Sequence, residues 1–282
     1  TKTADLTTAK ILFNSILSTP DAKHMTIDIK NSYLNTPMKS FEYMRIPVSH
    51  IPADIMDLYN LHDKVHNGAV YVEIRKGMYG LPQAGRIAND RLLVHLNKHG
   101  YHQAKHTHGL FTHDTRDISF SLVVDDFGVK YIHTADAQHL IDTLDSLYEI
   151  TTDWTGAKYL GLTLDWDYSA RTLDISMPGY VNRALTKFQH PAPTRSQHAP
   201  HKWIEPDYGS KQQQQPTETA SAAPLDSTGT HRVQSVNGTF MYYGRAVDPC
   251  ILVALNEIST EQAKPTTDTR DKTDMLMDYL HT

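Results

Sequence analysis

The sequence predicts an α+β protein: an antiparallel sheet flanked by helices, followed by a smaller helical part. Two observations lead to this fold class. In residues 1–189, short β-prone segments alternate with helical patterns, and several strands follow one another across tight polar turns, as in antiparallel hairpins. From residue 231 onward, apolar residues recur at helical spacing.

The elements of the first half follow from apolar periodicity and from the placing of glycine and proline. Pro20 ends the first helical pattern, and a glycine-rich bend precedes the second, which Gly100 ends. In chain order, we expect a helix over 3–19, strands over 24–29, 43–48 and 70–74, and a helix over 84–98.

The second half continues the alternation and then changes character. Residues 190–230 contain repeated prolines and the run Gln212–Gln215, which predicts a flexible low-complexity linker. The other expected elements are strands over 109–113, 118–124 and 127–132, a helix over 134–149, a hairpin of 158–166 with 171–177, and helical segments over 179–189, 231–260 and 268–281.

Composition favours a folded chain and excludes several classes of protein. The 282 residues are 39% hydrophobic, and no apolar run approaches the length of a membrane span. The single cysteine, Cys250, excludes a disulfide framework and a cysteine-based zinc site. The net charge of −5 does not indicate a nucleic-acid-binding protein, so such a role must rest on local clusters. Five histidines within residues 99–113 lack the spacing of a structural zinc site and predict a polar loop.

Three aspartates are the strongest candidates for chemistry. Asp28 ends a predicted strand, and Asp125 and Asp126 lie between two predicted strands. Paired aspartates are common in turns, where they bond their own backbone. Here, apolar β-prone segments on both sides would place the pair at the tip of a buried hairpin, which favours a functional role. Carboxylates on rigid elements are the ligands that two Mg²⁺ ions require in phosphoryl transfer.

Five motifs, in this order, resemble the reverse transcriptases of LTR retrotransposons, most closely those of the copia type. Each motif alone is weakly specific, whereas the order of all five is much more so. The segments are TIDIKNSYLNTPM (26–38, motif A), GMYGLPQAGRIAND (77–90, motif B), LVVDDFGVKY (122–131, motif C), KYLGLTLDWD (158–167, primer-grip hairpin) and VNGTFMYYGRAVDP (236–249, preceding ribonuclease H).

The resemblance implies a domain organisation. Residues 1–189 would form a polymerase palm with incomplete fingers and the primer-grip hairpin, and 190–230 would be the linker. Residues 231–282 would form a helical thumb or connection segment preceding a ribonuclease H domain. Because the family's upstream finger strands and ribonuclease H carboxylates have no counterpart, we expect a piece of a Pol polyprotein truncated at both ends.

The resemblance also assigns roles to residues. Asp28, Asp125 and Asp126 would be catalytic and, with the backbone carbonyl of Ile29, would bind two Mg²⁺ ions, for which Mn²⁺ can substitute. Tyr33 would be a steric gate that selects deoxynucleotides, and Gln83 would contact the incoming nucleotide. Taken alone, Tyr33 is more typical of a core aromatic and Gln83 of a surface turn. The primer grip would comprise Leu160, Gly161 and Leu162, which alone read as an ordinary hairpin.

The implied function is RNA-directed DNA polymerase activity, which transfers a nucleotide from a dNTP to a primer 3′-hydroxyl. The implied partners are a primed RNA or DNA template, dNTPs, and the integrase and ribonuclease H domains of the polyprotein, with no membrane. The implied location is intracellular, in a cytoplasmic virus-like particle with a nuclear phase. Two alternatives stay open: an inactive or truncated remnant that at most binds nucleic acid, and another metal-dependent phosphotransferase such as a nuclease. Motif B and the position of Tyr33 disfavour the nuclease.

Overall fold

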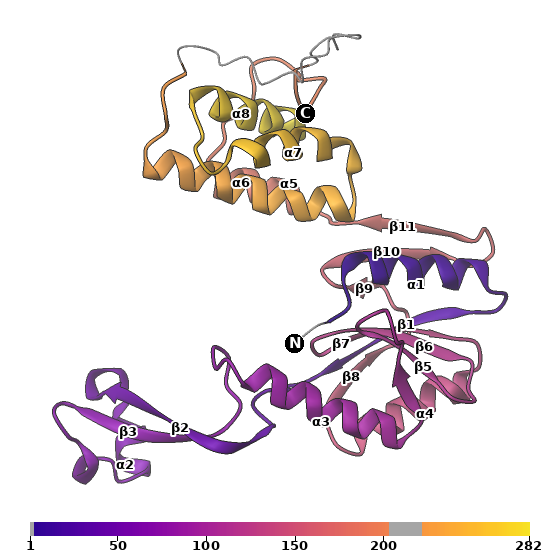
Figure 1. Cartoon of the computed structure of the whole chain (residues 1–282), viewed down its shortest axis with the longest axis vertical. Coiled ribbons are helices and arrows are strands. Elements are labelled where there is room, and N and C mark those ends of the chain that lie inside the picture. The colour runs from indigo at the N-terminus through magenta and orange to yellow at the C-terminus, as the bar shows by residue number, and fades with distance from the viewer. Residues whose placement is uncertain (1–2, 203–221) are drawn as a thin grey trace. The chain divides into compact units, whose positions relative to one another are not determined.

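The computed structural model describes residues 3–202 and 222–282, which divide into two compact units (Figure 1). The first unit runs to Leu160 and includes Trp166–Leu173, and the second comprises Gly161–Asp165 and Asp174–Thr282. Antiparallel sheets flanked by helices confirm the predicted α+β class. No helix within the two described ranges has both the length and the apolar character needed to cross a membrane.

A six-stranded sheet forms the centre of the first unit. Its order is β4-β5-β6-β7-β1-β8, and every neighbouring pair is antiparallel. The strands that sequence periodicity missed are the two at the edges, β4 and β8, which are short. The bounds are β1 (Lys23–Ile29), β4 (Tyr101–Gln103), β5 (Leu110–His113), β6 (Ile118–Val123), β7 (Asp126–Tyr131) and β8 (Ile150–Asp153).

Helices α3 (Ala84–Lys98) and α4 (Thr134–Asp145) cover one face of this sheet (Figure 1). Alternate residues of the central strands point into the core between sheet and helices. Because side chains alternate across a strand, the intervening residues of β1 and β7 lie on the opposite face. The core includes Met25, Ile27 and Ile29 of β1, Phe127, Val129 and Tyr131 of β7, and Leu92, Leu96, Leu140 and Leu144 of the helices.

Helix α1 (Leu6–Ser18) lies on the other face, where it contacts β1, β6 and β7 (Figure 1). The helix begins after Asp5, whose side chain accepts a hydrogen bond from the Thr8 backbone N–H at 2.7 Å, a typical N-cap. Leu12 and Ile16 form its buried stripe. This apolar stripe is the periodicity that predicted the helix from sequence.

His24 is a buried histidine on the α1 side of β1. Its ring centroid lies 5.5 Å from Phe13 and 5.0 Å from Trp166, and Nδ1 lies 3.2 Å from the Gly156 carbonyl oxygen. Burial lowers the pKa of His24 to about 4, because a charged imidazolium is poorly solvated among these rings. The histidine is therefore neutral in the folded protein at pH 7.

A separate two-stranded ribbon pairs β2 (Pro37–Pro47) with β3 (Ala69–Lys76). Both strands are longer than the predicted segments 43–48 and 70–74. The connection contains the short helix α2 (Ala53–Leu58) between two 3-10 turns, η1 (Val48–His50) and η2 (His62–Lys64). Helix α2 was not predicted, since six residues are too few to show a helical period.

The predicted strand 158–166 is interrupted. Strands β9 (Lys158–Tyr159) and β10 (Leu162–Asp167) flank a two-residue turn, and β11 (Thr172–Ser176) completes a three-stranded sheet. Leu160 and Gly161 form the turn with φ of 51° and 75°. Positive φ at both positions is typical of a type I′ hairpin turn, and Gly161 meets this requirement without steric cost.

Four helices form the core of the second unit: α5 (Tyr180–Lys187), α6 (Ser227–Ala246), α7 (Leu252–Glu261) and α8 (Thr267–His281). Helix α5 packs with the C-terminal helices, although the predicted organisation placed it within 1–189. The predicted helical segment 231–260 is two helices, because Pro249 opens the 3-10 turn η3 (Pro249–Ile251) between them.

The predicted linker 190–230 lies partly outside the described residues, which stop at 202 and resume at 222. Its last four positions are not linker but helix, since α6 begins at Ser227. The Asp226 side chain caps this helix by accepting a hydrogen bond from the Gly229 backbone N–H at 2.7 Å.

The buried His24 predicts a loss of stability in acid. Its pKa is about 4 when folded and 6.5 when exposed, so the unfolded chain binds a proton that the folded chain excludes. Above pH 6.5, His24 is neutral in both states and does not weaken the fold. As pH falls from 6.5 toward 4, protonation of His24 in the unfolded chain lowers the free energy of unfolding by up to about 3 kcal/mol. Urea denaturation of the wild type and of His24→Phe, followed at pH 7 and pH 4.5, measures it. A wild-type minus variant difference that does not change with pH would contradict the assignment.

Candidate active site

The hairpin between β6 and β7 has an unusual turn. Val123 pairs with Asp126, so Val124 and Asp125 are the two turn residues. Val124 has φ of 62°, which β-branched residues rarely adopt. A positive φ at the first turn position is typical of a type II′ turn, where glycine is usual. Strained backbone of this kind concentrates at functional sites.

The register of β1 against β7 places Asp28 directly opposite Asp126. Both side chains therefore leave the same face of the sheet, opposite the α3–α4 core. The interaction between the two carboxyl groups contributes to the raised pKa of Asp126. The backbone of Asp125 is held next to the end of β1, since its carbonyl oxygen accepts a hydrogen bond from the Ile29 N–H at 3.2 Å. The fold thus gathers the three aspartates that the sequence singled out.

Burial and crowding together shift the pKa values of Asp125 and Asp126. Burial, followed by the charges of Asp125 and Asp28, raises the pKa of Asp126 to about 6. Burial and then the charge of Asp28 also raise the pKa of Asp125. Each shift reports the cost of bringing negative charges together away from water, a cost that a proton or a cation relieves.

The donor atoms fit a hard divalent cation, because all three side chains are carboxylates. Lys30 does not neutralise them by direct contact, since its Nζ is bound to Glu149 Oε1 at 2.7 Å. Within residues 3–202 and 222–282, however, no group of three or more His, Cys, Asp or Glu side chains is arranged as a preformed metal site. The predicted ligand role of the aspartates and of the Ile29 carbonyl stays a prediction.

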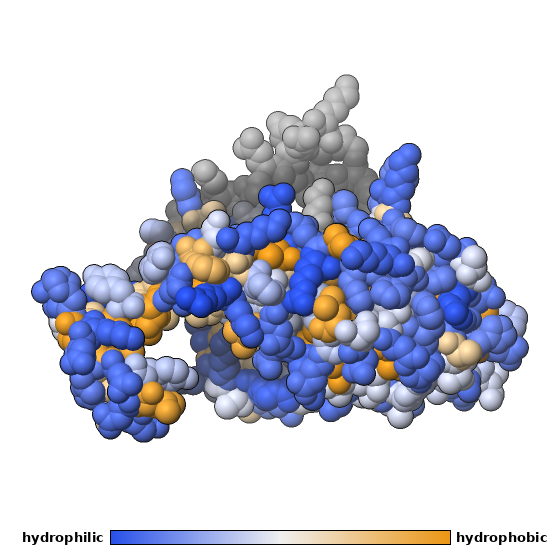
Figure 2. All heavy atoms as spheres, turned by 90° about the horizontal axis from the view of Figure 1, so that it is seen from below, coloured by the Kyte–Doolittle hydropathy of each residue, from blue (hydrophilic) through white to orange (hydrophobic). Residues whose placement is uncertain are grey.

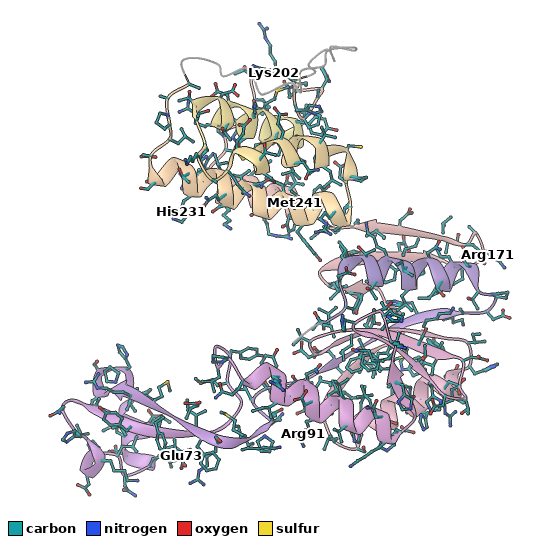
Figure 3. The ribbon with its side chains drawn as sticks, in the orientation of Figure 1. Glu73, Arg91, Arg171, Lys202, His231 and Met241 are labelled. Atoms are coloured by element: carbon teal, nitrogen blue, oxygen red, sulfur yellow. The ribbon has the colours of Figure 1, made fainter. Side chains whose placement is uncertain are left out.

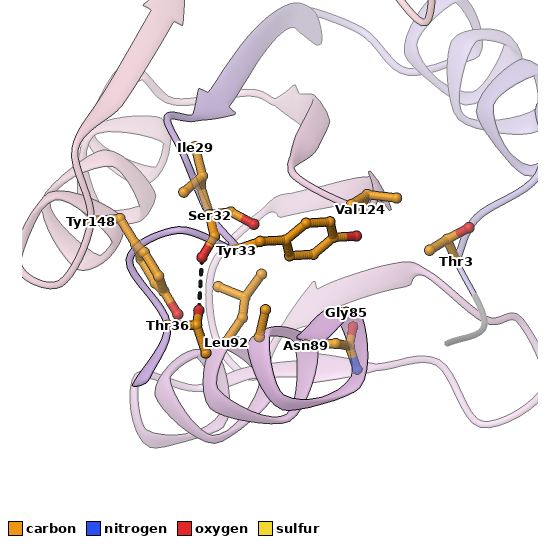
Figure 4. A pocket seen from close by; sticks show the side chains of 11 residues that line it. Thr3, Ile29, Ser32, Tyr33, Thr36, Gly85, Asn89, Leu92, Val124 and Tyr148 are labelled. Carbon is orange, nitrogen blue, oxygen red and sulfur yellow. Dashed lines mark hydrogen bonds between the residues drawn. The ribbon is translucent and has the colours of Figure 1, made fainter. Parts of the chain in front are cut away.

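Tyr33 lies near the aspartates and is half-buried rather than part of the core. Burial, followed by the charge of Asp125, raises the pKa of Tyr33. Its ring packs edge-on against Tyr79 at 5.1 Å and passes close to Gly85, where a Cβ atom would lie 3.4 Å from the Tyr33 hydroxyl (Figure 4). Helix α3 therefore supports the ring through a residue that has no side chain.

A small cavity of about 30 Å³ adjoins the Tyr33 ring (Figure 4). Its lining includes Ser32, Asn89 and the hydroxyl of Tyr148, which is buried and has no hydrogen-bond partner among the described residues. This space holds about one water molecule, so it is too small for a nucleotide.

The other predicted site residues are not brought to the aspartates by contacts in the structure. Gln83, immediately before α3, donates through Nε2 to Glu42 Oε1 of β2 at 2.6 Å. Leu160 belongs to the first unit, whereas Gly161 and Leu162 belong to the second. Their nucleotide and primer roles stay predictions.

Sequence reasoning did not single out two features of this site. One is the strained Val124, which appeared only as an apolar residue before the aspartate pair. The other is Tyr79, whose ring contact with Tyr33 joins residues far apart in sequence. The only sequence signal for a role of Tyr79 was that it is an aromatic residue within the glycine-rich segment 77–85.

The coupled carboxyl groups predict an unusual titration. In the absence of divalent cations, Asp126 should titrate near pH 6, and Asp28→Asn should lower this pKa by removing a repelling charge. Because the pKa of Asp126 is higher in the folded protein than the ordinary 3.8, protonation of Asp126 stabilises the folded state. This stabilisation is complete below pH 3.8 and is lost as pH rises through 6. Carbon-detected NMR of aspartate carboxyls in both proteins provides the measurement. An Asp126 pKa near 3.8 in the wild type would contradict the geometry.

Comparison with known proteins supplies the family. A family model described as reverse transcriptase (RNA-dependent DNA polymerase) matches residues 6–197, more than half of the chain. Among solved structures, a telomerase from Candida albicans in complex with a fragment of telomeric RNA is similar at 12% identity and a TM-score of 0.36. The alignment covers 67% of this chain and 38% of the telomerase chain. That likeness is weak, and the family match alone decides the assignment: the chain belongs to the reverse transcriptase (RNA-dependent DNA polymerase) family.

Proposed function

We propose that this chain carries the RNA-directed DNA polymerase activity of a copia-type LTR retrotransposon Pol polyprotein. The observation that carries the proposal is the β1–β7 register, which sets Asp28 against Asp126 with Asp125 beside them. The order of the five sequence motifs supports the copia type. A primed RNA or DNA template and dNTPs are the substrates, and the integrase and ribonuclease H domains of the polyprotein are the partners. The site of action is a cytoplasmic virus-like particle.

In the proposed reaction, the primer 3′-hydroxyl oxygen bonds to the α-phosphorus of a dNTP and loses its proton to water. The bond between the α-phosphorus and the oxygen that bridges to the β-phosphate breaks, and pyrophosphate leaves. Asp28, Asp125, Asp126 and the Ile29 carbonyl would hold two Mg²⁺ ions, or Mn²⁺ in their place, which supply charge neutralisation of the triphosphate and polarise the 3′-hydroxyl. The contribution of the protein is placement. Paired strands fix Asp28 and Asp126, and the hydrogen bond from Ile29 fixes the backbone of Asp125.

Substrate selection is assigned to the residues around the aspartates. The Tyr33 ring, supported at Gly85, would meet the sugar of the incoming nucleotide and exclude a 2′-hydroxyl. Gln83 would contact the same nucleotide after leaving Glu42, its present partner. The turn at Leu160, Gly161 and Leu162 would hold the primer strand.

Primer extension on an RNA template, with Mg²⁺ or Mn²⁺, tests this function. Asp125→Asn combined with Asp126→Asn removes two of the three carboxylates and should reduce extension by about 10³-fold or more. The matched control is Asp145→Asn, an exposed aspartate at the end of α4, which should leave extension unchanged.

Three results would contradict the proposal in different ways. Shortening of the primer instead of extension would identify a nuclease. Extension that survives the double substitution would remove the aspartates from the reaction. Binding of the primed template without extension under any condition would favour the inactive remnant.

A further inference from the structure

Two histidines at the C-terminal end of α3 have no role in the site described above. His95 lies in the last turn of the helix, and His99 is the residue that follows its end. They lie one and two turns beyond Arg91, which Figure 3 labels. Residues four apart on a helix are neighbours on its surface. The centroids of the two imidazole rings are 4.7 Å apart, so both rings can contact one small ligand.

Hydrogen bonds to backbone carbonyls fix the proton of each ring. His95 Nε2 lies 2.6 Å from the Thr143 carbonyl oxygen, and His99 Nδ1 lies 2.9 Å from the His95 carbonyl oxygen. Because a carbonyl oxygen can only accept, each of these nitrogens donates an N–H. In the neutral rings, the lone pairs are therefore on His95 Nδ1 and His99 Nε2. Within residues 3–202 and 222–282, no hydrogen bond uses either of these two nitrogens.

This arrangement is the one in which proteins present histidine to a metal ion. A metal-binding imidazole usually donates its other N–H to a carbonyl or a carboxylate, which fixes the tautomer and makes the free nitrogen more basic. The ring spacing agrees as well. With metal–nitrogen distances of about 2.0–2.1 Å and an angle of about 90–110° between them, two imidazoles on one ion have centroids about 4.5–5.2 Å apart. The observed 4.7 Å lies within this range.

The electrostatic surroundings of the two rings also favour a cation. The Thr143 carbonyl belongs to the last turn of α4, so the C-terminal ends of two helices meet at the rings. The C-terminal end of a helix carries a partial negative charge. The cation one turn before His95, Arg91, is turned to the Asn35 carbonyl oxygen, to which its Nη1 donates at 3.0 Å.

The donor atoms decide which ion fits. Imidazole nitrogen suits Cu²⁺, Ni²⁺ and Zn²⁺, whereas Mg²⁺ prefers oxygen ligands. The part of the chain that the structure describes offers no group of three or more His, Cys, Asp or Glu for a metal, so water has to complete the coordination. His99 is exposed, and the surface of the first unit in Figure 2, seen from the side of α3 and α4, is mostly hydrophilic, so water can reach the ion.

We propose that His95 Nδ1 and His99 Nε2 together bind one divalent late transition-metal ion, with water as its other ligands. Cu²⁺ binds more tightly than Ni²⁺ or Zn²⁺, as is general for nitrogen ligands. Because both ligands lie at the end of α3, the bound ion stabilises the last turn of this helix. The donor atoms are distinct from those of the three aspartates, and the proposal does not rest on the proposed function.

NMR of the histidine ring nitrogens tests the proposal, with the untagged, ¹⁵N-labelled whole chain titrated with Zn²⁺ in excess Mg²⁺. The resonances of His95 Nδ1 and His99 Nε2 should shift at lower Zn²⁺ concentration than those of any other histidine. His95→Gln and His99→Gln should each weaken Zn²⁺ binding by about tenfold or more, because one ring alone loses the gain from two linked donors. Glutamine retains an N–H that can donate to the same carbonyl oxygen.

The matched control is the double variant His106→Gln with His108→Gln, which removes two exposed histidines that are also close in sequence. Zn²⁺ affinity should be the same in this variant as in the wild type. A tenfold loss in the control, or first shifts at histidines other than 95 and 99, would overturn the proposal. Unchanged affinity in both single variants, when circular dichroism shows them folded, would overturn it too. Displacement of Zn²⁺ by Mg²⁺ would place the ion at the aspartates instead.

Discussion

The pairing of β1 with β7 is the constraint on which the candidate site depends. It joins segments far apart in sequence and sets Asp28 against Asp126. A slip of one residue would turn Asp28 toward the α3–α4 core and expose Ile27 or Ile29 on the other face. The apolar side chains that alternate with the aspartates therefore position the site by being buried. Core packing and chemistry are two consequences of the same register.

The site holds its groups at a cost in stability. Burial, followed by repulsion from Asp125 and Asp28, raises the pKa of Asp126 to about 6, and Val124 has a backbone conformation that suits glycine. Neither feature helps the chain to fold, and the large apolar core beneath the sheet offsets both. Local features that oppose folding are expected where a protein binds or reacts. Here they coincide with the residues that the motif order points to.

Local signals predicted much of the fold and the members of the site, but not their arrangement. Helix α3 follows its predicted bounds, because a bend precedes its apolar stripe and Gly100 ends it. Sequence periodicity could not show the six-residue α2, the short edge strand β8, or the turn at Leu160, each too short to set a period. The register that joins the aspartates and the bond of Gln83 to Glu42 depend on long-range packing, which a single sequence does not encode locally.

The central proposal is that strand register brings three carboxylates together to bind a divalent cation. Mn²⁺ binding, followed by the loss of the free-ion EPR signal, tests it most directly, without nucleic acid or nucleotide. The account predicts that the wild type binds Mn²⁺ more tightly as pH rises through about 6, and that Asp28→Asn or Asp126→Asn each weakens binding by about tenfold or more. Mn²⁺ affinity that is the same in the wild type and in both variants would contradict it.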